Sequence, residues 1–314
     1  MSVTSAAVDV ERLSRRFGLR AALDEASLRV EPGEVVGLLG PNGSGKTTLF
    51  RILATLLAPS GGTARIFGFD VVREAHAARR CFGVVFQNPS LDKMLTAAEN
   101  LRCQGRLYGV SGAALAERSQ QLLTRLALWD RRDDRIAAFS GGMARRVEIA
   151  KGLLHRPGLL LLDEPSTGLD PGARRDLWDL LDELRRGESM TILFTTHLME
   201  EADRADRLAI LDRGRVVAAG APESLKSAVG GDVIRIRTGE PAALRDEIAA
   251  RFGATVTISD GQLRIERPRG HEFIPQLIEA FPGRIEAASV GKPTLEDVFI
   301  RATGHGLYGT EGAA

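Results

Sequence analysis

Short apolar runs alternate with stretches of helical periodicity over residues 1–225. Four of the runs are almost continuously apolar, as expected for parallel strands that are covered on both faces: 35–39, 83–86, 159–162 and 191–195. Two earlier segments, 8–10 and 26–30, alternate in polarity and predict an antiparallel flank. Strands that alternate with helices in this way favour an α/β domain with a mostly parallel sheet.

The pattern changes between residues 96 and 155, where apolar positions recur at helical spacing only. Three helices are predicted there, over 98–108, 113–128 and 142–154, with arginines between the apolar positions. This segment therefore predicts a helical subdomain within the α/β domain.

The alternation of strands and helices restarts after a short linker at 226–231, which contains Gly230 and Gly231. Strands are predicted over 233–237, 255–258, 263–266 and 284–289, with a turn at Asp260 and Gly261. Helices are predicted over 241–252, 273–280 and 295–302. The order βαββαβ, followed by one helix, predicts a small ferredoxin-like α+β domain at 232–303. The Gly-rich end, 304–314, is expected to be a flexible tail.

Composition narrows the class of protein. The chain has 314 residues, of which 44% are hydrophobic, enough for one large domain or for a large and a small one. Its 42 Lys and Arg balance 41 Asp and Glu, so no surface for nucleic acid is indicated. Cys81 and Cys103 lack the spacing of a metal site and fit a reducing compartment. Residues 1–10 contain no signal-peptide pattern, and no apolar run is long enough to span a bilayer, so a soluble or peripheral protein is expected.

A glycine-rich loop follows the first buried strand and precedes a helical pattern. It fits G-x-x-x-x-G-K-[ST], the motif that cradles the phosphates of a nucleotide between a strand and the start of a helix. Lys46 would supply positive charge to the β- and γ-phosphates, and the Thr47 hydroxyl suits Mg²⁺. The sequence therefore predicts a nucleotide site rather than a structural glycine turn. Its residues are Gly40, Pro41, Asn42, Gly43, Ser44, Gly45, Lys46 and Thr47, with Thr48 next in the helix.

Two acids follow another buried strand, the run of four leucines at 159–162. Open α/β sheets bind their ligands at the carboxyl ends of the strands, so Asp163 and Glu164 are expected near the glycine-rich loop. Asp163 is suited to hold Mg²⁺, directly or through water. Glu164 is suited to accept a proton from the attacking water or to orient it. The alternative is a solvated pair of acids at a strand end.

These motifs together resemble those of the ATP-binding cassette (ABC) ATPases, a family of P-loop NTPases, over about residues 5–225. Gln87 resembles the Q-loop glutamine of this family, and His197 resembles its switch histidine. Asp170 belongs to a segment, 166–170, that resembles its D-loop. The signature sequence of the family is matched by Phe139, Ser140, Gly141, Gly142 and Met143.

The resemblance implies a role for each of these residues. Gln87 would reach Mg²⁺ or the attacking water, and His197 would hydrogen-bond the γ-phosphate. Ser140 opens a helix whose start would contact the nucleotide held by a second copy of the chain. Phe17 lies where the family usually has a tyrosine that stacks on adenine. A phenyl ring can also stack on a purine, but the departure leaves the preference for ATP over GTP open.

One subgroup is resembled more closely, the ATPase subunits of daunorubicin-type drug- and antibiotic-resistance exporters. Met143, Arg145 and Arg146 resemble the end of its signature, and 293–300 resembles its C-terminal region. The resemblance implies an ATP- and Mg²⁺-dependent ATPase that forms a homodimer around two ATP. Its partner would be an integral membrane permease, at the cytoplasmic face of the membrane, and no nucleic acid is expected.

Two other functions stay open on sequence grounds. One is a soluble ABC ATPase that acts on nucleic acid, ribosomes or cluster assembly, and the other is the motor of an importer. The chain lacks the long coiled coil and the cysteine clusters of DNA-repair relatives. The helical patterns after residue 240 differ from the small β-barrel expected of an importer motor. The cargo cannot be inferred, since its contacts would lie in the membrane partner.

Overall fold

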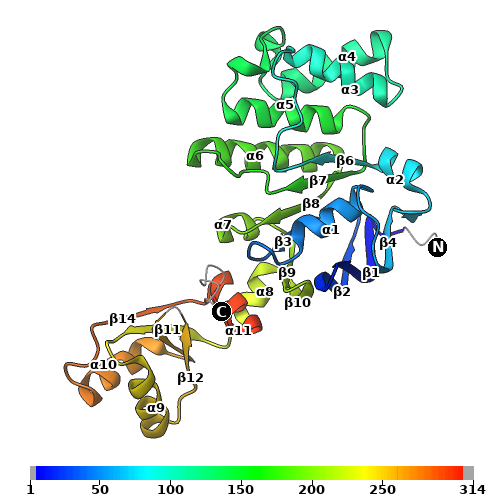
Figure 1. Ribbon diagram of the computed structural model, residues 1–314. Coiled ribbons are helices and arrows are strands. Elements are labelled where there is room, and N and C mark those ends of the chain that lie inside the picture. The colour runs from blue at the N-terminus through cyan, green and yellow to red at the C-terminus, as the bar shows by residue number, and fades with distance from the viewer. Residues whose placement is uncertain (1–4, 260, 307–314) are drawn as a thin grey trace.

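The structure, a computed structural model, describes residues 5–259 and 261–306 of the chain (Figure 1). Its central sheet contains β3 (Val35–Leu39), β6 (Phe82–Val85), β7 (Leu159–Asp163), β8 (Thr191–Thr196), β9 (Arg207–Asp212) and β10 (Arg215–Gly220). The strand order is β10-β9-β3-β8-β7-β6, and only β10 runs antiparallel to its neighbour. Every residue of β3, β7 and β8 is buried, which confirms the predicted parallel core strands.

A four-stranded antiparallel sheet flanks this core, as predicted, with β1 (Val8–Phe17), β2 (Arg20–Val30), β4 (Gly61–Ile66) and β5 (Phe69–Asp70). Its first two strands are longer than the predicted 8–10 and 26–30. Exposed charged residues such as Arg12 and Arg16 interrupt the alternation of apolar and polar positions by which a strand is recognised. Helix α1 (Lys46–Leu53) buries Leu49 and Phe50 in a cluster that includes residues of both sheets.

The predicted helical region lies at one end of the molecule in Figure 1. It contains α3 (Ala97–Leu107), α4 (Gly112–Arg125) and α5 (Gly141–Leu153), and two 3-10 helices at Trp129–Arg131 and Ile136–Ala138. The predicted extension of the second helix to residue 128 is wrong, because Ala127 adopts a left-handed φ of 54°. Leu126 and Leu128 are nevertheless buried, which explains the apolar signal. Helix α2 (Ala75–Cys81) contacts β6, and α6 (Pro171–Glu188) contacts α5.

After two short helices, α7 (Met199–Ala202) and α8 (Pro222–Ser227), the chain forms a third sheet of β11 (Asp232–Arg237), β12 (Val256–Ser259), β13 (Gln262–Arg267) and β14 (Ala287–Gly291). Its order, β12-β13-β11-β14, is fully antiparallel, with α9 (Pro241–Phe252) and α10 (Gly270–Ala280) packed on it. The βαββαβ order is as predicted. The last strand starts at Ala287 rather than at 284, and Asp260 of the predicted turn lies outside the described residues.

The last helix, α11 (Leu295–Thr303), returns to the first part of the chain (Figure 1). Leu295, Val298 and Phe299 belong to the same buried cluster as residues of α5 and α6. Asp297 of the same helix binds Arg235 and Arg264 of the small sheet, with which the prediction groups it, so α11 contacts both parts of the chain. His305 Nε2 then lies 3.3 Å from Asp212 Oδ2 of β9, so the start of the predicted tail contacts the core. The rest of that tail, 307–314, lies outside the described residues. Across the part of the chain that is described, no helix is long and apolar enough to cross a membrane.

Candidate nucleotide-binding site

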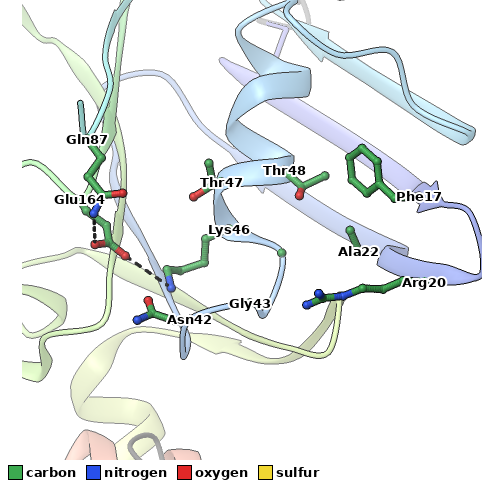
Figure 2. Close-up of a pocket in the computed structure, with 11 residues that line it drawn as sticks. Phe17, Arg20, Ala22, Asn42, Gly43, Lys46, Thr47, Thr48, Gln87 and Glu164 are labelled. Carbon is green, nitrogen blue, oxygen red and sulfur yellow. Dashed lines mark hydrogen bonds and ion pairs between the residues drawn. The ribbon is translucent and has the colours of Figure 1, made fainter. Parts of the chain in front are cut away.

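A cavity of about 420 Å³ lies between the glycine-rich loop and the hairpin of β1 and β2 (Figure 2). Its walls come from the hairpin, the loop and start of α1, and the segments that follow β6 and β7. The lining residues are Phe17, Arg20, Ala22, Asn42, Gly43, Gly45, Lys46, Thr47, Thr48, Gln87 and Glu164. All of them except Arg20 and Ala22 are predicted site residues, so the fold brings these nine predicted residues together around one cavity.

The glycine-rich loop packs so closely on its neighbours that two of its glycines have no room for a side chain. A Cβ on Gly45, which has a φ of 111°, would lie 2.4 Å from the carbonyl oxygen of Ala22. A Cβ on Gly40 would lie 2.3 Å from the carbonyl oxygen of Leu211. The loop can therefore lead directly from β3 into α1. The first backbone amides of α1 face the cavity without an intrahelical partner, which favours an anion there.

Lys46 is the buried cation of this loop, with 4% of its surface exposed. Its ammonium donates to the carbonyl oxygens of Gly40 (2.7 Å) and Pro41 (3.0 Å), and it lies 3.7 Å from Glu164 Oε1. Burial lowers the pKa of Lys46, while the carboxylates of Glu164 and Asp163 oppose this shift. The ammonium of Lys46 is thus held inside the loop by carbonyl oxygens, and phosphate oxygens can replace these as its hydrogen-bond acceptors.

Four side chains converge on the carboxylate of Glu164, which follows β7. Lys46 Nζ and His197 Nδ1 lie 3.7 Å and 3.3 Å from Oε1. Gln87 Nε2 and the Thr167 hydroxyl donate to Oε2 at 3.4 Å and 3.1 Å. Figure 2 shows the carboxylate between Gln87 and Lys46. Glu164 has a φ of 46°, which is uncommon for a residue with a side chain and is typical of functional positions.

Asp163 precedes Glu164 as the last residue of β7 and is 2% exposed. Burial raises its pKa above the ordinary value, and the neighbouring Glu164 raises it further, whereas the hydroxyls of Thr195 and Thr47 and the Lys46 charge lower it. Thr195 donates to Asp163 Oδ1 at 2.7 Å and accepts from the Glu164 amide at 2.9 Å. A residue of β8 that the sequence analysis treats only as part of a buried strand therefore orients both acids.

The predicted signature and D-loop residues form helix starts outside this cavity. Ser140 is the N-cap of α5, and its hydroxyl accepts from the Met143 amide at 3.3 Å, with Gly141 and Gly142 between them. Asp170 is the N-cap of α6, where its carboxylate accepts from the Ala173 amide at 2.9 Å. The fold of one chain thus does not bring the signature into its own phosphate-binding cavity.

Helix α5 also holds the segment that follows β6. The guanidinium of Arg145, which is 6% exposed, donates to the carbonyl oxygens of Phe86 (2.7 Å) and Gln87 (3.1 Å). The carboxylate of Glu148, which is 2% exposed, accepts from the Ser90 amide at 2.6 Å. In the sequence, Arg145 stands out only as a mark of a subgroup and Glu148 gives no signal, since charged residues on a helix are usually solvated.

Phe17 and Arg20 are paired across the turn between β1 and β2, and both line the cavity. The Phe17 side chain is exposed, and the guanidinium of Arg15 lies 4.7 Å from its ring centroid. An exposed ring on a cavity wall is suited to stack on a base. Arg20 is absent from the predicted site, because a single arginine outside any motif gives no sequence signal for the direction of its side chain.

Comparisons with known proteins agree with a nucleotide-binding site in this cavity. The ABC transporter family model matches residues 23–167. The daunorubicin/doxorubicin resistance ATP-binding protein DrrA of Streptomyces peucetius is 40% identical, over 95% of this chain and 93% of that protein. The Nod factor export ATP-binding protein I of Paraburkholderia xenovorans is 41% identical, over 95% of this chain and 97% of that protein.

Two solved structures share the fold of the first part of the chain. An ATP-binding subunit of an ABC transporter has a TM-score of 0.64 at 33% identity, over 71% of this chain and 92% of that one. CbiO1 of Clostridium perfringens, part of the ABC transporter complex cbiONQ, has a TM-score of 0.66 at 25% identity, over 79% and 96%. By its sequence, its fold and its site, the chain belongs to the ABC transporter family as an ATP-binding subunit.

Proposed function

We propose that this chain is the ATP-hydrolysing motor of an ABC exporter, which acts on a separate membrane subunit at the cytoplasmic face of the membrane. The relatives that act in daunorubicin resistance and Nod factor export support the exporter role over an importer or a soluble ATPase. One observation carries the proposed chemistry. The carboxylate of Glu164 lies beside the phosphate loop, in contact with Lys46, Gln87 and His197.

The cavity fits ATP in its size and in the kinds of groups that line it. Phe17 would stack on the base, while the amides of the glycine-rich loop, Lys46 and Thr48 would bind the phosphates. Ser44 supports this arrangement, because its hydroxyl is buried and makes no hydrogen bond to any residue that the structure describes. A phosphate oxygen in the loop would give that hydroxyl a partner.

Two residues that line the cavity, Thr47 and Gln87, and Asp163, which is hydrogen-bonded to Thr47 behind the lining, fit Mg²⁺. Thr47, Gln87 and Asp163 offer hydroxyl, amide and carboxylate oxygens, the donors that this ion prefers. The raised pKa of Asp163 supports the assignment, since it marks a buried carboxylate whose charge is incompletely compensated within the protein. When bound, Mg²⁺ would neutralise part of the charge on the phosphates.

Glu164 would accept a proton from the water that attacks the γ-phosphorus. His197 and Gln87 would orient that water and the γ-phosphate, because each already lies within 3.4 Å of a Glu164 oxygen. Lys46 would exchange its loop carbonyl partners for phosphate oxygens. Phosphoryl transfer needs positioning and charge stabilisation more than covalent help from the protein, which is what these residues provide.

A complete site would need two copies of the chain. The signature start of α5 lies outside the cavity of its own chain, so Ser140, Gly141, Gly142 and Met143 would contact the nucleotide held by a second copy. Asp170, at the start of α6, would lie at the same dimer interface. The N-terminus of a helix with a hydroxyl and two glycines is a favourable site for a phosphate.

The variant Glu164→Gln tests this dimer, because it should bind ATP without releasing the dimer through hydrolysis. Its molar mass, measured by light scattering, should double with ATP and stay that of one chain without it. Adding Ser140→Arg to the same variant should prevent the doubling while leaving ATP binding intact. A mass that stays single with saturating ATP would contradict the proposed dimer.

Helix α5 provides a route from nucleotide to membrane partner. It begins at the signature, and its Arg145 and Glu148 hold the segment 86–90. We expect the segment 88–96 to form part of the groove for the membrane subunit. Charge reversal at Asp92 or Lys93 should reduce transport, measured as efflux, more than it reduces ATP hydrolysis by the purified chain.

The proposed function as a whole is tested by expressing the chain together with a candidate membrane subunit of an ABC exporter. Cells should extrude an anthracycline faster than cells with the membrane protein alone, and Lys46→Ala should abolish this efflux and the release of phosphate from ATP. Phosphate release that is independent of Lys46, or efflux that is indifferent to the chain, would contradict the proposal.

A further inference from the structure

We propose that Arg20 is a second cation of the nucleotide site and binds the diphosphate segment that ATP and ADP share. The inference rests on the proposed nucleotide site, and it assigns a role to a residue outside the glycine-rich loop, the signature and the two acids. Three observations carry it: the position of Arg20 on the cavity wall, its lack of another partner, and the balance of charge around the cavity.

The hairpin places Arg20 against the phosphate loop. Phe17 and Arg20 are a directly paired position of β1 and β2, separated by a turn of two residues, and cross-strand partners face the same side of a sheet. Both line the cavity. Figure 2 shows the Arg20 side chain extending from the hairpin towards the loop at Gly43. A Cβ built on Gly43 would lie 3.4 Å from Arg20 Nη2, so the guanidinium borders the loop itself.

The guanidinium of Arg20 has no competing partner in the part of the chain that the structure describes. Among the described residues it makes no hydrogen bond and no ion pair. Two other arginines of the same hairpin are engaged, since Arg12 pairs with Glu25 at 2.8 Å and Arg15 donates to the Ala58 carbonyl oxygen at 2.9 Å. The five donors of Arg20 are therefore free for a ligand in the cavity, and their fork matches the geometry of phosphate oxygens.

Without Arg20, the charged side chains that line the cavity would have a net charge of zero. Lys46 and Glu164 lie 3.7 Å apart and carry opposite charges, so together they contribute none. Arg20 is the remaining charged residue of the lining and makes its net charge positive. A diphosphate is strongly negative, and the exposed guanidinium of Arg20 would complement the buried ammonium of Lys46 in binding it.

Calorimetric titration with ADP and with adenosine tests the assignment on the full chain. Arg20→Gln should weaken ADP binding by roughly 5- to 10-fold, the loss expected for one partly exposed hydrogen bond to a charged group. Its affinity for adenosine should equal that of the wild type. Arg20→Lys should recover part of the ADP affinity. Arg16→Gln is the matched control, since Arg16 is an exposed hairpin arginine that does not line the cavity, and it should bind both ligands normally.

Lys46→Ala separates this inference from the proposed function. If Lys46→Ala loses ADP binding while Arg20→Gln binds ADP like the wild type, the role of Arg20 is wrong and the nucleotide site stands. If Lys46→Ala binds ADP normally, the nucleotide site itself is wrong. An equal loss of ADP and adenosine affinity in Arg20→Gln would also overturn the inference, because it would indicate a contact with the base or a disturbed hairpin. Thermal unfolding without nucleotide should be unchanged in Arg20→Gln.

Discussion

Two carboxylates in different parts of the molecule are equally inaccessible but have different surroundings. Asp163 at the nucleotide cavity is 2% exposed, and Asp297 in α11 is 0% exposed. Arg235 Nη2 lies 2.7 Å from both oxygens of Asp297, and Arg264 Nε lies 3.1 Å from one of them. Asp163 instead accepts a hydrogen bond from the Thr195 hydroxyl and is followed by a second acid, Glu164.

The pKa values of the two acids move in opposite directions. Burial raises the pKa of each, because it disfavours the charged form. At Asp297 the hydrogen bonds of Thr294 and the charges of Arg235 and Arg264 outweigh burial and lower the pKa, whereas at Asp163 burial prevails. The protein thus completes the charge balance of one acid internally. The other acid remains available to a cation that arrives with the ligand.

The largest expected difference between the nucleotide cavity and the small sheet with its helices is in the rate of ATP hydrolysis. Glu164→Gln should lower the rate of ATP hydrolysis by about 10²- to 10⁴-fold, the usual contribution of a general base, and should keep ATP binding. Phosphate release and calorimetric titration measure the two effects. Glu279→Gln, an exposed acid on α10, is the matched control and should hydrolyse ATP normally. A Glu164→Gln variant that retains most of its turnover would contradict the assignment of Glu164 as the general base.

Two phenylalanines test which residues unfold with the nucleotide-binding part of the chain and which unfold with the small sheet of β11–β14. Phe299 of α11 is 0% exposed in the cluster shared with α5 and α6, and Phe273 is 2% exposed in the separate core of the small sheet. Replacing either by alanine should cost about 3–5 kcal/mol. Calorimetry with and without ATP shows which part of the molecule has lost stability, since ATP raises the unfolding temperature of the part that binds it.

The two alanine variants should lower different unfolding transitions. Phe299→Ala should lower the unfolding transition that responds to ATP, and Phe273→Ala should lower a transition that does not. If both variants lower the same transition equally, the two cores unfold as one unit, and the distinction between the regions is wrong for stability.

Much of this molecule was accessible from sequence because the informative residues are adjacent in the chain. The glycine-rich loop is eight consecutive residues, and its conformation follows from the glycines and the lysine at fixed spacing. Asp163 and Glu164 follow a run of four leucines, so the end of a buried strand could be placed within one residue. The strand and helix order of the small sheet followed from periodicity in the same way.

The remainder depends on contacts between distant segments. Periodicity gave α11 an apolar face but did not indicate which core Phe299 would join. The burial of Arg145 and Glu148 depends on the segment after β6, and the orientation of Arg20 depends on its pairing with Phe17. Charged residues in such positions look like solvated surface until the partner segment is known.

Asp297→Asn tests whether the arginines make Asp297 a structural acid. Its folded pKa is lowered, so its contribution to stability is present above the ordinary value near pH 4 and is lost as the pH falls through the folded value. The variant should lose about 1–3 kcal/mol at pH 7, because Arg235 and Arg264 would lose a charged partner. Urea unfolding at pH 7 and pH 3 should show a smaller difference from the wild type at pH 3. An equal difference at both values would contradict the assignment.

Asp163→Asn should give the smallest effect, and with the opposite sign. The folded pKa of Asp163 is raised, so the stability that protonation provides is present below the ordinary value and is lost as the pH rises through the folded value. At neutral pH the ionised acid therefore destabilises the empty protein, and asparagine, whose carbonyl can still accept from Thr195, should raise the unfolding temperature slightly. With Mg²⁺ and ATP the order should reverse, because only the wild type gains the full binding energy. If Asp163→Asn instead lowers the unfolding temperature without ligand, Asp163 is as structural as Asp297, and the contrast between the two acids does not hold.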